Sequence, residues 1–212
     1  MKDNSLIIIP TYNEAENIKA VINKIFSLDD YNSILVVDDN SPDRTSNIVR
    51  NLKKNYEDKL FLITREKKDG LGSAYKEGFK WAIEKNFSYI FEMDADLSHD
   101  PNEIKKLKRM LVNGECDVAI GSRYLEGVSV VNWPLSRIFL SYFANIYVRL
   151  ITCMPVKDST SGFVGYKIEA LSSLDINKIK FNGYAFQIEM KFKLWKKKFK
   201  LKEHQIIFVN RE

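Results

Sequence analysis

Two aspartates separated by one residue, Asp94 and Asp96, directly follow the expected strand from Tyr89 to Met93. On an extended segment this spacing turns both carboxylates to the same side. Paired carboxylates bind Mg²⁺ or Mn²⁺ and leave coordination positions open to the oxygens of a diphosphate. The pattern therefore predicts a divalent metal at Asp94 and Asp96. Capping of the next helix is the weaker alternative, because Asp100 already stands where that helix begins.

Two further apolar runs also end in acidic residues. Thr11-Tyr12-Asn13-Glu14 comes after residues 6–9, and Asp38-Asp39 comes after residues 34–37. The carboxyl ends of parallel strands meet at one edge of a sheet, where open α/β sheets bind ligands. Three acidic strand ends would repel one another without a cation or hydrogen-bond donors between them. Asp38-Asp39 fits a local turn equally well, since Asp commonly initiates turns.

Short β-branched runs alternate with helical patterns over the first 120 residues, which predicts β-α units in a mostly parallel sheet with helices on both faces. Strands are expected at 6–9, closed by Pro10, and at 34–37, 60–63, 89–93, 118–120 and 205–209. Helices are expected near 18–26, after the turn at 40–43, and at 73–85, 100 onward, 134–151 and 185–199. The 212 residues predict a single Rossmann-like α/β domain with added amphipathic interfacial helices.

Composition narrows the function classes. Hydrophobic residues make up 45% and charged residues 29% of the chain, which is ordinary for a globular protein. The net charge of +5 favours anionic partners. Cys116 and Cys153 stand alone, which predicts neither a disulfide nor a zinc site and fits a reducing compartment. Glycine-rich dinucleotide and P-loop motifs are absent, and no segment has the pattern of a signal peptide or membrane span.

Two of the expected helices have patterns that suggest membrane contact. In 134–151, Arg137, Ser141, Asn145 and Arg149 form one polar stripe, and the remaining positions are largely apolar. This helix is expected to lie at a membrane interface or over a lipid-phosphate groove, or equally well to be a core helix. In 185–199 an apolar stripe (Ile188, Phe192, Trp195 and Phe199) is flanked by lysines at 191, 193, 196, 197, 198, 200 and 202. These lysines form either a solvated face or a contact to anionic lipid. Their arrangement beside apolar stripes argues against nucleic acid as a partner.

Six motifs occur in order along almost the whole chain: Pro10-Thr11-Tyr12-Asn13-Glu14, residues 36–43 (VVDDNSPD), residues 94–99 (DADLSH), Gly121-Ser122-Arg123-Tyr124, Thr160-Ser161-Gly162-Phe163 and Phe186-Gln187-Ile188-Glu189. In these motifs the chain resembles family 2 glycosyltransferases of the GT-A fold. Within that family it is most similar to dolichol-phosphate, or polyprenol-phosphate, mannosyltransferases. The resemblance implies inverting, metal-dependent transfer of mannose from GDP-mannose to a polyprenyl phosphate.

The resemblance also implies roles for individual residues. The base and ribose of the donor would be held by Pro10, Tyr12, Glu14, Val37 and Asp39. The metal and diphosphate would be held by Asp94, Ala95 and Asp96, and Arg211 would also contact the diphosphate. The acceptor phosphate would be held by Arg123, Arg137 and Ser141. Residues 1–122 would form the nucleotide-sugar-binding half and residues 123–212 the acceptor-binding half. The enzyme would act on the cytoplasmic face of a membrane, bacterial or of the endoplasmic reticulum, with or without a membrane-embedded partner subunit.

Two departures from the family pattern bear on these roles. Ser98 stands where some members carry a glutamine that binds the metal, so Ser98 would contribute weakly or through water. The chain ends at Glu212 without the Gly-X-Ser-Lys stretch that usually follows the equivalent of Arg211, which implies a truncated C-terminus.

Elementary chemistry agrees with a phosphate acceptor. A phosphate monoester is already an anionic nucleophile at neutral pH, so the reaction needs cations more than a general base. Arg123 and the Arg137 region supply such cations, and His99 is expected to be structural. Two rival functions remain: a family 2 transferase that uses UDP-glucose or another sugar nucleotide, and a non-catalytic nucleotide-sugar-binding or membrane-recruitment subunit.

Overall fold

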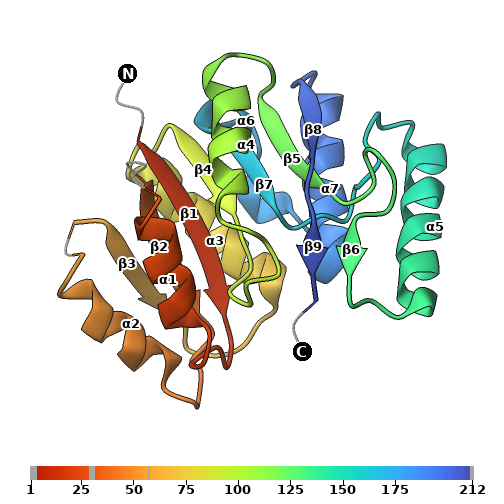
Figure 1. Cartoon of the computed structure of the whole chain (residues 1–212). Helices are drawn as coiled ribbons and strands as arrows, with labels where there is room; N and C mark the ends of the chain where they lie inside the picture. The colour runs from red at the N-terminus through yellow and green to blue at the C-terminus, as the bar shows by residue number, and fades with distance from the viewer. Residues whose placement is uncertain (1–3, 29–31, 57, 211–212) are drawn as a thin grey trace.

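The computed structural model describes residues 4–28, 32–56 and 58–210 (Figure 1). Its main sheet has seven strands in the order β3-β2-β1-β4-β7-β5-β8. They are β1 Ser5–Thr11, β2 Asn32–Asp38, β3 Leu60–Thr64, β4 Tyr89–Glu92, β5 Val118–Ser122, β7 Val164–Lys167 and β8 Leu201–Gln205. Only β7 is antiparallel to its neighbours β4 and β5. The predicted mostly parallel α/β sheet is therefore confirmed.

Strand β1 alternates its side chains between two cores. Leu6 and Ile8 belong to one core, and Ile7 and Ile9 to the other. Pro10 was expected to close this strand, but β1 continues to Thr11 and Pro10 pairs with Val37 of β2. Pairing with β4 ends at Ile8, so the missing amide hydrogen of Pro10 costs no hydrogen bond at that edge.

Helices cover both faces of the sheet. The helices are α1 Ile18–Phe26, α2 Thr45–Lys53, α3 Leu71–Glu84, α4 Glu103–Val112, α5 Leu135–Thr152, α6 Ile168–Ser172 and α7 Gly183–Lys196, with a 3₁₀ turn at Ile176–Lys178. Apolar side chains of α3, α6 and α7 build one core, and those of α1, α2 and α4 build the other. Asp100 stands just before α4, where its carboxylate accepts the backbone N–H of Asn102.

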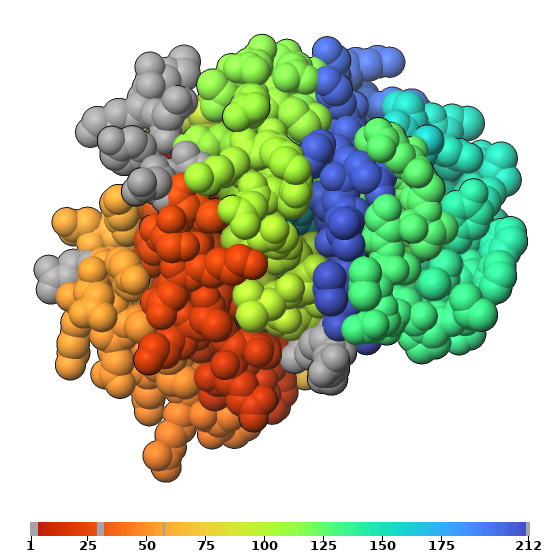
Figure 2. Space-filling view, viewed as in Figure 1, coloured from red at the N-terminus to blue at the C-terminus, as the bar shows by residue number. Residues whose placement is uncertain are grey.

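Helix α5 lies beside the sheet and forms the right-hand edge of the molecule (Figures 1 and 2). Asn145 is its only buried residue, while Leu140, Phe143 and Leu150 are 75%, 60% and 72% exposed. The alternative of a core helix is therefore wrong. Arg137, Ser141 and Asn145 of the polar stripe face the protein, whereas Arg149 and most of the large apolar side chains face outward, which is nearly the reverse of an ordinary surface helix. No helix in the described residues is long and apolar enough to span a membrane.

The C-terminal part differs most from the sequence prediction. Instead of one strand at 205–209, the chain forms β8, whose residues alternate weakly in hydrophobicity, and then β9 Phe208–Val209. Strand β9 pairs with β6 Val130–Val131 in a separate small sheet. The apolar stripe of α7 packs against the core through Phe192 and Trp195, and Lys191 is fully buried. All four residues of that stripe are therefore half-buried.

Candidate active site

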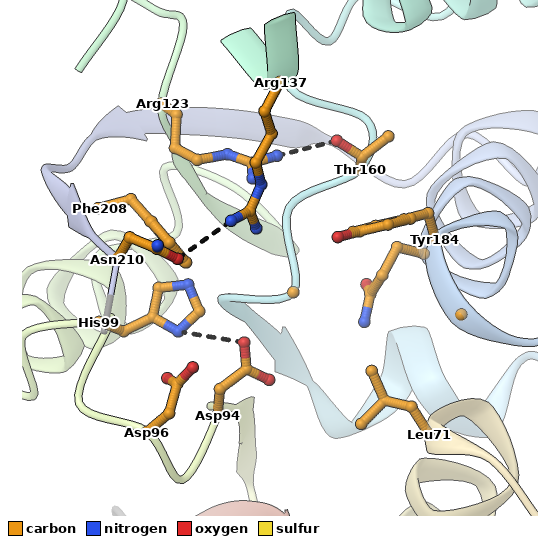
Figure 3. Close-up of a pocket in the computed structure, with 13 residues that line it drawn as sticks. Leu71, Asp94, Asp96, His99, Arg123, Arg137, Thr160, Tyr184, Phe208 and Asn210 are labelled. Atoms are coloured by element: carbon orange, nitrogen blue, oxygen red, sulfur yellow. Dashed lines mark hydrogen bonds and ion pairs between the residues drawn. The ribbon is translucent and has the colours of Figure 1, made fainter. Parts of the chain in front are cut away.

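Three adjoining cavities lie beyond the carboxyl ends of the strands. The first, the acidic pocket, has about 290 Å³ and is lined by Pro10, Thr11, Tyr12, Glu14, Asp39, Lys68, Gly70, Leu71, Ala74, Asp94, Ala95 and Asp96. The second, the central pocket, has about 430 Å³ and shares Leu71, Asp94 and Asp96 with the first (Figure 3). The third, the apolar groove, has about 370 Å³ and shares Arg123, Arg137, Thr160 and Tyr184 with the second. The shared residues place the three cavities next to one another, from an acidic end to an apolar end.

Asp94 and Asp96 stand where the acidic and central pockets meet, and Figure 3 shows both carboxylates directed into the cavity. Strand β4 ends at Glu92, so a turn rather than extended backbone brings the two side chains together. Leu97 closes this turn with a left-handed φ of 60°, and Asp96 Oδ1 accepts the backbone N–H of Ser98 at 3.1 Å.

The donor set fits a divalent ion that keeps part of its coordination for substrate. Two carboxylate side chains reach one cavity, and no group of three or more acidic, histidine or cysteine residues in the described part of the chain forms a complete metal cage. Mg²⁺ and Mn²⁺ are commonly bound in this way, through one or two carboxylates plus phosphate and water oxygens. Ser98 does not line the cavity, and its hydroxyl is buried, so the structure does not place it at the metal.

The two aspartates at the end of β2 differ in role. Asp38 accepts hydrogen bonds from Thr11, Ser41 and Ser46 and holds the turn that follows the strand. Asp39 lines the acidic pocket, where Arg65 Nη1 lies 2.8 Å from its Oδ1. Burial raises the pKa of Asp39, and the attraction of Arg65 opposes that rise. Asp38 therefore stabilises the turn, whereas Asp39 stands where it can contact a molecule bound in the acidic pocket.

Most of the other residues predicted to bind the sugar-nucleotide donor lie together at the acidic pocket. Pro10, Tyr12, Glu14 and Ala95 line the acidic pocket. The ring of Tyr12 carries Lys68 Nζ over its face, 3.8 Å from the ring centroid. Val37 does not line the pocket, because its side chain is fully buried in the core. Arg211 lies outside the described residues.

Arg123 reaches both the central pocket and the apolar groove from the loop after β5. Its Nε and Nη2 each donate to the carboxylate of Asp158 at 2.7 Å, and Nη2 also donates to Thr160 Oγ1 at 2.8 Å. Both members of the pair are buried. Burial raises the pKa of Asp158, but the hydrogen bonds and charge of Arg123 outweigh it and hold that pKa below its ordinary value. Asp158 thus fixes the cation in one orientation.

Arg137 and Ser141 enter the site from the first two turns of α5. The guanidinium of Arg137 stacks on Trp133, 3.9 Å from the ring centroid. It also donates to Asn210 Oδ1 at 3.0 Å, as Figure 3 shows. Ser141 lines the apolar groove and accepts the hydroxyl of Tyr124 at 2.8 Å. The predicted acceptor residues Arg123, Arg137 and Ser141 are therefore brought together at one cavity.

His99 is buried between Phe163, on which its ring stacks, and Phe208. Burial lowers the pKa of His99 to about 4, so the ring is neutral at pH 7. Its Nδ1 lies 3.8 Å from Asp94 Oδ2 (Figure 3). This packing agrees with a structural role for the residue.

A buried polar network lies behind the central pocket. Gln187 of α7 lines that pocket, and its Nε2 donates to Glu92 Oε2 at 2.6 Å. Lys191, one turn later, is fully buried. Burial raises the pKa of Glu92 and lowers the pKa of Lys191, and the attraction between their charges opposes both shifts.

The sequence assigned no role to several residues of the site: Lys68, Asp158, Thr160, Tyr184, Gln187 and Asn210. Thr160 and Gln187 belong to motifs that carried the family resemblance, so their position in those motifs was an available signal. Asp158 precedes one of these motifs by two residues, and only the fold reveals that it faces Arg123.

The α/β sheet and the paired aspartates beside the acidic pocket suit a transferase that uses a sugar nucleotide. Comparison with known proteins makes the assignment explicit, because the model of the family "Glycosyl transferase family 2" matches residues 6–175. The chain belongs to glycosyl transferase family 2 and is an enzyme of that family.

Two characterised relatives match almost the whole chain. A polyprenol monophosphomannose synthase of Mycolicibacterium smegmatis is 39% identical over 208 residues, which cover 98% of this chain and 78% of that protein. An undecaprenyl-phosphate mannosyltransferase of Micrococcus luteus is 35% identical over 207 residues, covering 98% and 84%.

Solved structures confirm the GT-A fold. A glucosyl-3-phosphoglycerate synthase from Mycobacterium tuberculosis, crystallised with Mn²⁺ and UDP-glucose, superimposes with a TM-score of 0.73. The match covers 100% of this chain and 72% of that one at 17% sequence identity, so it establishes the fold alone.

Proposed function

We propose that the enzyme transfers mannose from GDP-mannose to a polyprenyl phosphate, with inversion at the anomeric carbon and with Mg²⁺ or Mn²⁺ as cofactor. The observation that supports this proposal is the adjacency of the three cavities, from the acidic pocket past Asp94 and Asp96 to the apolar groove. The names of the two relatives support mannose as the sugar and a polyprenyl phosphate as the acceptor.

The donor would occupy the acidic pocket and the adjoining part of the central pocket. Tyr12 offers an aromatic surface to a base, and Asp39, fixed by Arg65, offers a carboxylate to base or ribose donors. Asp94 and Asp96 would hold the divalent ion, which neutralises the diphosphate charge when bound.

The acceptor would enter from the apolar groove. Trp133, Leu140 and Ile188 give this groove an apolar wall suited to isoprene units. Arg123 and Arg137 stand where the groove opens into the central pocket, so the acceptor phosphate would meet two guanidinium groups. The phosphate would then face the donor across the pocket.

The residues present suit a nucleophile that needs no general base. His99 is buried between Phe163 and Phe208, and Asp94 and Asp96 are assigned to the metal. The acceptor phosphate already carries negative charge at neutral pH, so its oxygen can attack once it is oriented and its repulsion with the donor is screened. Arg123 and Arg137 supply that orientation and screening.

Helix α5 would rest on the membrane that holds the acceptor. Phe139, Phe143, Tyr147, Leu150 and Ile151 are all more than half exposed, and such a wide apolar face suits an interfacial helix. The same helix contributes Arg137 and Ser141 to the groove, so contact with the membrane would place the acceptor site at the lipid surface. We place the enzyme at the cytoplasmic face of that membrane.

The experiment that tests this proposal compares a polyprenyl phosphate with the corresponding polyprenol as acceptors for GDP-mannose. Transfer to the phosphate and at least about 100-fold less to the alcohol is expected, because only the phosphate is an anionic nucleophile that the arginines can bind. Equal transfer to both lipids would refute the proposed acceptor chemistry.

A further inference from the structure

Lys191 is a fully buried amine in the middle of α7. The other buried residues of this helix are the apolar Phe186, Met190 and Leu194 and the polar Gln187. Burial of an ammonium group costs roughly several kcal/mol of hydration free energy. The new partners of the group must offset this cost. An apolar residue such as methionine would fill this position without that cost, so the lysine requires an explanation.

The contacts of the amine point to the loop beside the active site. Lys191 Nζ donates to the carbonyl oxygens of Ser159 and Ser161 at 3.1 and 2.7 Å. Thr160, between these two serines, lines the central pocket and accepts a hydrogen bond from Arg123. One buried cation therefore fixes both ends of the turn that contacts the predicted acceptor-binding arginine.

The other side of the network reaches the strand that leads to the predicted metal site. Gln187 Oε1 accepts from Lys191 Nζ at 3.3 Å, and Gln187 Nε2 donates to Glu92. Glu92 also accepts the hydroxyl of Tyr166 at 3.2 Å. Gln187 thus bridges the amine of Lys191 and the carboxyl group of Glu92, and the charges of these two groups attract each other.

We propose that Lys191 is a positioning residue: through the carbonyls of Ser159 and Ser161 it holds Thr160 and Arg123 in the orientation that receives the acceptor phosphate. This inference rests on the proposed function for the identity of the acceptor. Lys191 itself touches no substrate and acts through the turn that it fixes.

The rival explanation is that Lys191 serves only to neutralise Glu92. Three variants separate the two roles. Glu92→Gln removes the negative charge but keeps the amine and its carbonyl acceptors. Glu92→Gln/Lys191→Met removes both groups, so neither is left buried without the other, and an unchanged circular dichroism spectrum checks that the variant is folded. Lys196→Met, an exposed position on the same helix, is the matched control for loss of a lysine.

The first readout is hydrogen exchange at the backbone amides of Ser159, Ser161 and Phe163, which are hydrogen-bonded in this segment. Exchange in the double variant should be at least about ten-fold faster than in Glu92→Gln, while Lys196→Met matches the wild type. Equal exchange in the double variant and Glu92→Gln would overturn the proposal, because the amine would then hold nothing in place.

The second readout is steady-state kinetics with a polyprenyl phosphate and GDP-mannose. The double variant should raise the acceptor KM by about ten-fold over Glu92→Gln and leave the donor KM within about two-fold. An unchanged acceptor KM would overturn the positioning role even if exchange is faster. If the wild type shows no transfer, the proposed function fails; calorimetric binding of inorganic phosphate to the same variants then replaces kinetics, and affinity equal to that of Glu92→Gln overturns the positioning role.

Discussion

Arg123 and Asp158 form a buried ion pair in which Nε and Nη2 of the arginine each donate to a different carboxylate oxygen at 2.7 Å. Asp158 also accepts the backbone N–H of Arg123 at 2.9 Å. Arg123 is therefore fixed both at its backbone and at its guanidinium group. An arginine held in this way loses little conformational entropy when it binds an anion, which suits a phosphate-binding role.

Asp158→Asn should destabilise the protein by about 3–5 kcal/mol, because it leaves the buried Arg123 without a counter-charge. Urea unfolding at pH 7 measures this loss. Asp175→Asn, which removes an exposed ion pair with Lys178, is the control and should change stability by less than about 1 kcal/mol. A similar small loss in both variants would contradict the structural role of Asp158.

The stability difference between the wild type and Asp158→Asn should depend on pH. The pKa of Asp158 is lowered in the folded protein, so its contribution is fully present above its unfolded-state pKa, near the ordinary value of 3.8. The contribution is lost as the pH falls through the lower folded-state pKa. Urea midpoints measured from pH 7 downward should therefore converge only below pH 3.8, and convergence above that pH would be inconsistent with the ion pair.

Asp96→Ala should reduce metal-dependent transfer by roughly 100-fold or more, because it removes one of the two carboxylates expected to hold the cation. Initial rates over a Mn²⁺ titration give the result. Asp100→Ala, which lies outside the cavities near α4, should keep most of the activity. Wild-type activity in Asp96→Ala would exclude Asp96 from metal binding.

Arg137→Ala should raise the KM for the polyprenyl phosphate about ten-fold and leave the donor KM within about two-fold, since Arg137 stands between the central pocket and the apolar groove. Arg149→Ala changes an exposed arginine on the same helix and serves as the control. Equal increases in both KM values would refute the division between donor and acceptor sites.

Phe139→Ser/Phe143→Ser should weaken binding to phospholipid vesicles by about ten-fold or more, because two exposed aromatic side chains of α5 would no longer insert at the interface. Vesicle co-sedimentation measures binding, and an unchanged urea midpoint shows that the fold is intact. Val112→Ser, which changes an exposed apolar residue of α4, is the control. Unaltered binding of the α5 variant would show that another surface meets the lipid.

Much of the fold is predicted from the sequence because the local composition of several strands already indicates that they are buried. Residues 34–37 are apolar in succession, as expected for a strand buried on both faces, and lie within β2. The prediction of one strand at 205–209 is wrong because β8 is polar at several positions and β9 has only two residues. Both strands are determined by their partners, β5 and β6. Pattern alone does not reveal such partners.

In the candidate site too, some residues are recognised from the local sequence and others only from the fold. Asp94, Asp96 and Arg137 are predicted because polar residues at strand ends and along an otherwise apolar helix stand out in the sequence. Val37 and Ser98 stand in matching motifs, yet the fold buries their side chains away from the cavities. Lys191 looked like one of several surface lysines, and only the packing of α7 places it in the interior.

The central claim is tested most directly by transfer of labelled sugar into a chloroform-extractable polyprenyl phosphate, with GDP-mannose and UDP-glucose compared with and without Mn²⁺. The account predicts Mn²⁺-dependent labelling from GDP-mannose and at least about 100-fold less from UDP-glucose. Preferential labelling from UDP-glucose would contradict the proposed donor. No labelling from either donor, with nucleotide binding intact, would contradict the proposed catalytic function and favour a non-catalytic nucleotide-sugar-binding role.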